Sequence, residues 1–386
     1  MRRAGWRSRR TVDHDQGMAD IQGSPAPGTN DTTHDGPTGP TGPGQPLRTE
    51  TIAPGVFAFI QGDGSWGWSN AGLVASRGEA LLVDTFYTLP LTRRLRAAVA
   101  EAAPDARVTT VVNTHLNGDH CHGNQLFPDA EIITSDANAA GIDHEVPPAL
   151  YPQLQQNPPA GPAGEYFTHH FGHFDFSGIE FTPPTRTFRD RLDLRVGDLD
   201  VELLNVGPAH TGGDVVVHVP EASTVFLGDI LFQDDHPVVW AGPVLAWADA
   251  CDRLIATGAR TFVPGHGRLA GPADLARFRD YLRHVHEEAA RAAAAGVPLA
   301  TAARAIPLDA YADWPLSERV VATVAAVYRE VGAPAPAAPL ELLTMMAEIA
   351  AERGARPSGS GRLPHQGRAT HEDAREPGAA RGDTAE

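Results

Sequence analysis

One short segment of the chain combines histidine and aspartate at spacings that suit a metal ion. Residues 114–124 read THLNGDHCHGN and directly follow the run VTTVVN at 108–113. Three later segments also place histidine or aspartate after an apolar run: AHTGGD at 209–214, LGDI at 227–230 and PGHG at 264–267. Neutral imidazole and ionised carboxylate are good ligands for a borderline divalent cation such as zinc. We therefore expect these side chains to meet at strand ends and to bind metal.

The surrounding chain alternates between short apolar runs and helical patterns. Runs typical of β-strands cover residues 56–60, 72–75, 80–83, 108–112, 131–134, 199–206, 215–219, 224–227 and 260–264. Helical patterns at 91–103 and 245–257 lie between some of these runs. Three further helices are expected after the last motif, with Pro272 as a first residue, Ser317 as a cap and an apolar stripe at 340–352. Interleaved strands and helices predict an α/β sandwich.

The order and context of the motifs resemble the metallo-β-lactamase superfamily of metallohydrolases. The first motif of that superfamily is His-x-His-x-Asp-His, and a histidine, a bridging aspartate and a last histidine follow it. The resemblance covers roughly residues 51–269 and includes all five motif blocks in order. One position differs, because Asn117 stands where the superfamily has its second histidine. The resemblance implies a four-layer αββα sandwich with the metals at one edge and with added C-terminal helices.

The composition and the resemblance together divide the chain into four parts. Residues 1–46 and 354–386 have few large apolar side chains, so we expect disordered tails that cannot offset the entropy of ordering. The resemblance implies that residues 47–270 form the catalytic domain. Residues 271–353 are expected to form helices packed on that domain.

The resemblance also implies a two-metal centre. Two histidines hold the first ion, three side chains hold the second, and one carboxylate bridges them: His115 and His210, then Asp119, His120 and His266, then Asp229. Asn117 is a candidate weak ligand or oxyanion donor, since a neutral carboxamide is a poorer zinc ligand than imidazole. We expect one or two Zn²⁺ per chain, with tighter binding at the second position, and iron as the alternative metal.

Other residues are expected to support this centre. Asp119 and Asp229 are the candidate catalytic residues, and Asp119 would also orient or deprotonate a water molecule. Asp84 occupies the place of a structural aspartate behind the site. His122 is a candidate replacement ligand or supporting hydrogen-bond donor, and we favour a polar residue near the site with no direct bond to metal.

Aromatic residues suggest where a substrate binds. Trp66, Trp68 and Trp240 are candidates for an apolar pocket that takes a bulky or acyl group. The proline-rich, aromatic segment at 143–176 is expected to be a loop, either a lid over the site or a surface loop folded on its own aromatics. Its three histidines at 169, 170 and 173 are interpreted as solvated, with metal binding as the alternative.

The composition of the chain excludes some classes of binding partner and indicates a cellular compartment. The net charge of -17 argues against a nucleic-acid or anionic-membrane surface, and the 31 basic residues are all arginine, which excludes lysine chemistry. Two cysteines are too few for a disulfide framework, so we expect a reducing cytoplasm. The arginine-rich start lacks the apolar region of a secretory signal, and Met18 is an alternative start. The expected partner is a small-molecule substrate, and a dimer stays open.

Three functions fit these observations. The leading one is a zinc hydrolase that uses metal-bound hydroxide to cleave a thioester, lactone, ester or lactam. The second is a mononuclear iron redox enzyme that resembles persulfide dioxygenases, because histidine and aspartate ligands serve both metals. The third is a non-catalytic relative that binds a metabolite, and the near-intact ligand set argues against it.

Overall fold

The structure is a computed structural model that describes residues 47–336 and 338–354. All the described residues belong to one compact unit. The two tails expected at 1–46 and 354–386 lie outside the described residues, except for Gly354. No helix of the described part is long and apolar enough to span a bilayer.

Two sheets form the centre of this unit. The larger sheet has the order β1-β2-β3-β4-β5-β6-β7 and the smaller has the order β12-β11-β10-β9-β8. The strands of the larger sheet are β1 (Leu47–Ala53), β2 (Val56–Gln61), β3 (Ala71–Ser76), β4 (Glu79–Val83), β5 (Arg107–Val112), β6 (Glu131–Ser135) and β7 (Arg186–Phe188). Those of the smaller sheet are β8 (Arg191–Val196), β9 (Leu199–Asn205), β10 (Val215–Val219), β11 (Thr224–Phe232) and β12 (Thr261–His266). Every predicted strand region is present, whereas β1, β7 and β8 had not been predicted.

Each sheet combines antiparallel and parallel pairing. Strands β1 to β4 pair antiparallel, and β4 to β7 pair parallel. In the smaller sheet only β11 and β12 pair parallel, while β8 to β11 are antiparallel. Parallel neighbours end at the same edge of a sheet, so residues that follow β4 and β5 come close together.

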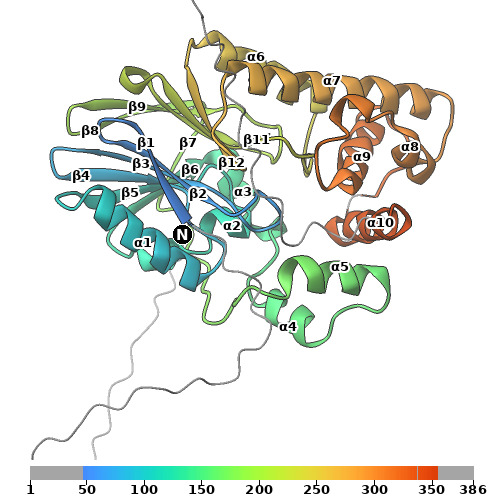
Figure 1. The fold of residues 1–386 in the computed structure, drawn as a ribbon, viewed down its shortest axis with the longest axis horizontal. Coiled ribbons are helices and arrows are strands. Elements are labelled where there is room, and N and C mark those ends of the chain that lie inside the picture. The colour runs from blue at the N-terminus through green and yellow to red at the C-terminus, as the bar shows by residue number, and fades with distance from the viewer. Residues whose placement is uncertain (1–46, 337, 355–386) are drawn as a thin grey trace, which may run out of the picture. The chain divides into compact units, whose positions relative to one another are not determined.

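The two sheets pack face to face and carry helices on their outer faces. Alternate residues of both sheets, such as Val74, Leu81, Val217 and Phe226, form one buried cluster between them. Helix α1 (Leu89–Ala102), which Thr88 caps through its side chain, covers the outer face of the larger sheet. In Figure 1 the sheets lie between α1 on one side and α6 (Val244–Ala256) and α7 (Pro272–Ala294) on the other. This arrangement is the predicted four-layer αββα sandwich.

The C-terminal helices share a core with the smaller sheet. Besides α7 they are α8 (Leu299–Ala305), α9 (Val320–Glu330) and α10 (Pro339–Glu352). One buried cluster joins residues of β11 and α6 to residues of these helices, for example Leu231, Trp247, Val285 and Val324. The expected cap at Ser317 is wrong: residues 317–319 form a 3₁₀ turn (η5), and no side chain caps α9.

The aromatic segment at 143–176 is helical, which corrects the predicted loop. It contains α4 (Leu150–Gln156) and α5 (Pro162–Phe171), with Pro162 at a first helical position. Buried residues of α5, including Phe167 and Phe171, recur at helical spacing and join the core on the outer face of the larger sheet. These aromatics are therefore part of the core rather than a free lid.

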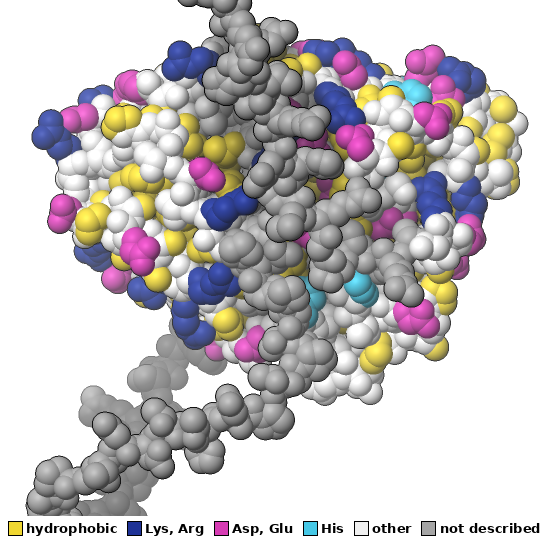
Figure 2. All heavy atoms as spheres, viewed as in Figure 1, with side chains coloured by type: hydrophobic (Ala, Val, Ile, Leu, Met, Phe, Trp, Pro, Cys, Tyr) yellow, Lys and Arg dark blue, Asp and Glu magenta, His cyan; other side chains and the backbone are white. Residues whose placement is uncertain are grey.

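Short helical pieces complete the described part of the chain. They are α2 (Gly118–Cys121), α3 (Asp136–Ala140), and the 3₁₀ turns η1 (Asn124–Leu126), η2 (Ile142–His144), η3 (Pro220–Ala222) and η4 (Asp309–Tyr311). On the face drawn in Figure 2, acidic and basic side chains are interspersed over the described surface. Exposed ion pairs of the described residues include Arg195–Asp200 (2.6 Å) and Arg283–Asp252 (2.5 Å).

Candidate metal centre

The predicted metal-binding residues come together where strands of both sheets end. The loop after β5 supplies His115, and the short helix α2 supplies Asp119 and His120. The loop before β10 supplies His210. Two neighbouring parallel strands deliver the last two residues, Asp229 within β11 and His266 at the end of β12. The sandwich therefore gathers six residues that are spread over more than 150 positions of the sequence.

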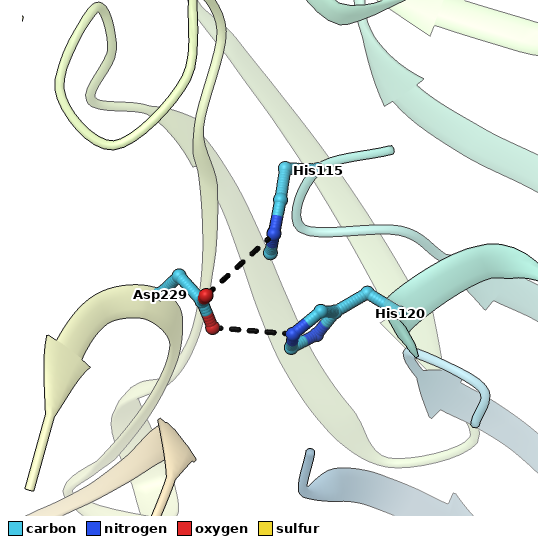
Figure 3. A group of neighbouring side chains, drawn as sticks. All are labelled: His115, His120 and Asp229. Carbon is cyan, nitrogen blue, oxygen red and sulfur yellow. Dashed lines mark ion pairs between the residues drawn. The ribbon is translucent and has the colours of Figure 1, made fainter. Parts of the chain in front are cut away.

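Asp229 lies between two pairs of histidines. Its Oδ2 atom is 3.4 Å from His210 Nε2 and 3.8 Å from His115 Nε2. Its Oδ1 atom is 3.2 Å from His120 Nε2 and 3.6 Å from His266 Nε2. Figure 3 shows His115 and His120 pointing at the two oxygens of this carboxylate. Each oxygen thus faces one of the two predicted ligand sets, as a bridging carboxylate would.

Asp119 completes the second set. Its Oδ2 atom lies 3.3 Å from His266 Nε2 and 3.9 Å from His120 Nε2. The ligand atoms of these three residues lie within 4.8 Å of one another, as do those of His115, His120 and Asp229. We call the surroundings of Asp119, His120 and His266 the second subsite, and those of His115 and His210 the first subsite.

The donor atoms of this centre fit a divalent cation. His115 Nε2, His120 Nε2 and Asp229 Oδ1 are buried and have no hydrogen-bond partner among the described residues. Buried polar atoms are ordinarily paired, and leaving one unpaired costs free energy. Imidazole nitrogens and carboxylate oxygens that converge in this way match the ligand preference of zinc and of iron.

Hydrogen bonds on the outer nitrogens aim three of the histidines inward. Asp84 Oδ2 accepts from His120 Nδ1 at 2.9 Å, and Thr114 Oγ1 lies 3.0 Å from His115 Nδ1. The Val238 carbonyl accepts from His210 Nδ1 at 2.6 Å. Since the proton then sits on Nδ1, each Nε2 atom keeps its lone pair for a metal.

Asp84 is the buried carboxylate behind the centre, where it had been expected. It accepts hydrogen bonds from the Thr114 amide (2.7 Å) and from the Thr114 hydroxyl (2.8 Å) as well as from His120. Its φ of 61° places it in the left-handed region, which bends the chain directly after β4. Burial raises the pKa of Asp84, and the contact with His120 opposes that shift.

Glycine allows Asp229 to approach its neighbouring strand closely. A Cβ atom on Gly265 would lie only 1.9 Å from Asp229 Oδ1, so no other residue fits at this position without displacing the carboxylate. The Pro-Gly-His-Gly segment therefore serves the centre in two ways, because Gly265 makes room and His266 follows it as a candidate ligand.

Burial and charge set the protonation of the centre. Burial lowers the pKa of His115 and of His210, which favours the neutral ring that binds metal. Burial also opposes ionisation of Asp119, yet the nearby His120 and His266 outweigh it and hold the pKa of Asp119 below its ordinary value. Asp119 is therefore a carboxylate at neutral pH.

A family model of the metallo-β-lactamase superfamily matches residues 64–266 of the 386-residue chain, more than half of it. The chain belongs to the metallo-β-lactamase superfamily. The match spans all the candidate ligands described above.

Individual relatives are distant. The 2,4-dinitroanisole O-demethylase subunit alpha of Nocardioides sp. (strain JS1661) is 24% identical over 222 residues, which cover 57% of this chain and 55% of that protein. The linear primary-alkylsulfatase of Pseudomonas sp. (strain ATCC 19151) is 24% identical over 247 residues, which cover 55% of this chain and 44% of that protein. The chain thus spans about half the length of these relatives.

Solved structures of metallo-β-lactamases are also similar to this chain. The DIM-1 metallo-β-lactamase is 19% identical with a TM-score of 0.46, and the match covers 62% of this chain and 98% of that one. The metallo-β-lactamase from Pontibacter korlensis is 19% identical with a TM-score of 0.46, and covers 62% and 99%.

Asn117, predicted from the sequence as a candidate weak ligand or oxyanion donor, lies at the first subsite. Its Oδ1 atom is 2.9 Å from His210 Nε2, and its Nδ2 atom donates to Glu145 Oε2 at 3.0 Å. Glu145 had not been predicted from the sequence, because it lies in a connecting segment without a motif. Burial raises the pKa of Glu145, while the hydrogen bond from Asn117 lowers it.

His122 lies close to the centre but belongs to neither ligand group. Its Nδ1 atom is 3.2 Å from the Tyr87 carbonyl oxygen, and its ring stacks on that of Tyr87 with centroids 5.6 Å apart. Burial lowers the pKa of His122 to about 4. Tyr87, whose ring lies 5.5 Å from that of Tyr151, was not predicted near the site, whereas Tyr151 belongs to the aromatic segment that was expected to be a lid or a surface loop.

The three candidate pocket tryptophans have different surroundings. Trp66 donates from Nε1 to the Tyr166 hydroxyl at 2.9 Å, and the guanidinium of Arg319 lies 4.3 Å from the centre of its ring. Trp68 stacks on His173 with centroids 5.6 Å apart. Trp240 is packed against the helical core, and its backbone amide donates to the His210 carbonyl at 3.0 Å.

The arginine that covers Trp66 is itself buried. The side chain of Arg319 is 1% exposed, and it forms an ion pair of 3.0 Å with Asp235. A desolvated cation over an indole ring contributes about 2 kcal/mol. This contact joins the loop after β2 to the C-terminal region.

The histidines at 169, 170 and 173 do not gather into a metal group within the described residues. His169 and His173 are exposed, whereas His170 is buried against Trp66 and Tyr166. Two of the three are thus solvated as expected, and His170 belongs to the core.

Proposed function

We propose that this chain is a metal-dependent hydrolase that cleaves a carboxylic-acid derivative such as a thioester, lactone, ester or lactam. The observation that carries the proposal is the division of four inward-facing histidines between the two oxygens of Asp229. His115, His210 and Asp229 would hold one ion, and Asp119, His120 and His266 would hold another with Asp229. Bound divalent metal, with zinc the expected ion, would supply Lewis acidity and a nucleophile at neutral pH.

The residues of the chain have separate parts in this reaction. Asp119 stays ionised, so its free carboxylate oxygen can orient a water molecule and accept its proton. Asp84 and Thr114 keep two histidine rings in one orientation, which avoids reorganisation during the reaction. Asn117 lies where its amide can assist the first subsite or a developing oxyanion. Tyr87 and Trp68 are buried, and as walls of a substrate pocket their rings would exclude water.

Cleavage of a sulfate ester is the second candidate. It is favoured by the similarity to a linear primary-alkylsulfatase, whose name denotes that substrate class. The same centre serves this reaction, because an anionic leaving group and an attacking oxygen can both be stabilised by cations. We further propose a small-molecule substrate and a cytoplasmic location for the protein.

The test combines metal analysis with a substrate panel. Elemental analysis of untagged protein should find one or two Zn²⁺ per chain, and a panel of thioesters, lactones, esters, lactams and primary alkyl sulfates should include a substrate. Asp119→Ala should reduce kcat by at least about 10²-fold, since it removes a general base. Asp105→Ala, which removes an exposed carboxylate, is the control.

Three results would contradict this proposal. Hydrolysis that survives in Asp119→Ala after metal is lost would exclude the mechanism. Iron together with oxygen uptake on persulfides would favour the redox alternative. Metabolite binding without turnover would favour a non-catalytic relative.

A further inference from the structure

Two hydrogen-bond acceptors, Asn117 Oδ1 and His210 Nε2, face each other at the first subsite, and a cation between them would satisfy both. His210 Nδ1 lies 2.6 Å from the Val238 carbonyl oxygen, which can only accept, so the ring carries its proton on Nδ1. In the neutral, metal-binding ring the Nε2 atom then has a lone pair. Asn117 Oδ1 lies 2.9 Å from that nitrogen and is also an acceptor. Two lone pairs that face the same point without a proton between them are arranged as two ligands of one ion.

Glu145 decides which end of the amide faces His210. Asn117 Nδ2 donates to Glu145 Oε2 at 3.0 Å, so the amide oxygen must point the other way. Rotating the amide by half a turn would pair Nδ2 with His210 Nε2, but it would also place Oδ1 against the Glu145 carboxylate. Two acceptor oxygens at that distance repel each other, and the carboxylate therefore holds the oxygen inward.

Glu145 also supplies charge where the first subsite lacks it. The second subsite has the carboxylate of Asp119 in addition to the shared Asp229, whereas Asn117 is neutral. A carboxylate that accepts from the far side of a ligand raises the basicity of that ligand, as carboxylates do behind zinc-bound histidines. Through the Asn117 amide, Glu145 places one negative charge a single hydrogen bond away from the first subsite.

We propose that Glu145 is a positioning residue of the first subsite: it fixes and polarises the Asn117 amide so that Oδ1 binds metal beside His115, His210 and Asp229. This inference rests on the proposed metal centre. Glu145 comes from the connection between η2 and α4, so a segment outside the motif blocks completes the ligand set. The replacement of histidine by asparagine is thereby compensated from another part of the chain.

The experiment is a Zn²⁺ titration of the full-length apoprotein by calorimetry, with elemental analysis of the loaded protein. The unsubstituted protein should show a tighter and a weaker step. Glu145→Ala should weaken the weaker step by about 10- to 100-fold and leave the tighter step unchanged, as for other residues that orient a ligand. Glu145→Gln can still accept from Asn117 Nδ2, so it should recover part of the loss, and the weakening that remains reports the missing charge.

The control is Asp143→Ala, which removes an exposed carboxylate two residues away and should leave both steps unchanged. The proposal would be overturned if Glu145→Ala left both Zn²⁺ dissociation constants unchanged, or if it weakened both binding steps equally. A single Zn²⁺ step in the unsubstituted protein would overturn it too, while a one-metal hydrolase would stand. No Zn²⁺ binding at all would defeat the proposed function itself.

Discussion

The two subsites of the candidate metal centre differ in the groups that accept hydrogen bonds from their histidines. In the second subsite, His120 donates to the buried carboxylate of Asp84, and Asp119 brings a charge of its own. In the first subsite, His115 and His210 donate to neutral oxygens, a hydroxyl and a backbone carbonyl. A carboxylate behind a histidine increases its strength as a ligand, whereas a neutral oxygen mainly orients it. Asn117, a neutral side chain, therefore lies in the subsite whose histidines have the weaker support.

The largest expected effect comes from removing the charge behind the second subsite. Asp84→Asn keeps the size of the side chain, and asparagine tolerates the left-handed φ of this position. We expect Zn²⁺ to bind the tighter step about 100-fold more weakly, because His120 loses its carboxylate partner. Zn²⁺ titration of the apoprotein measures this change. If only the weaker step moves, the assignment of the stronger support to the second subsite is wrong.

A histidine at position 117 should make the two subsites more alike. Asn117→His replaces an amide oxygen by imidazole, the better zinc ligand, and its second ring nitrogen can donate to Glu145. We expect the weaker Zn²⁺ step to tighten by about tenfold and the metal content to approach two per chain. Elemental analysis after dialysis is the measurement, and kcat on a responsive substrate shows whether tighter binding lowers activity. Asn117→Ala, which offers no ligand, should shift the same step in the opposite direction.

The smallest effect on metal binding is expected at His122. Its pKa in the folded protein is about 4 and its ordinary value is 6.5, with burial as the main cause. As the pH falls from 6.5 to 4, the unfolded chain takes up this proton and the folded protein does not, so stability decreases. In His122→Gln, the free energy of unfolding of the apoprotein should decrease less between pH 6.5 and pH 4. Urea unfolding at several pH values measures this difference. Both Zn²⁺ steps should stay within about twofold, and a larger loss would make His122 a ligand.

The sequence predicted the part of the site that follows strand ends. Imidazole and carboxylate side chains such as His115, Asp229 and His266 come directly after or within apolar runs, and adjacent strands bring such positions together. The same regularity supported an α/β sandwich, because alternating strands and helices have few compact arrangements, and the resemblance to the superfamily specified the αββα layers. The pattern marked these residues as candidates, and the resemblance to the superfamily assigned each of them to one metal position.

The other residues near the site could not be predicted, because their positions depend on packing between segments that are distant in the sequence. Glu145 and Tyr151 reach the centre because α4 and α5 fold against the larger sheet, and no spacing rule marks either residue. The helix α5 itself was predictable, since Pro162 begins it and Phe167 and Phe171 recur one turn apart. Its many prolines and aromatics were interpreted as a loop, although the apolar periodicity was the stronger signal.

The cation–π contact between Trp66 and Arg319 joins residues that are synthesised at very different times. Every candidate ligand has been made once His266 has left the ribosome, but the cation that covers Trp66 follows only with Arg319. The nascent protein therefore contains all its candidate metal ligands before Arg319 can cover Trp66. A chain that stops between His266 and Arg319 would keep the candidate ligands and lack this cation–π contact.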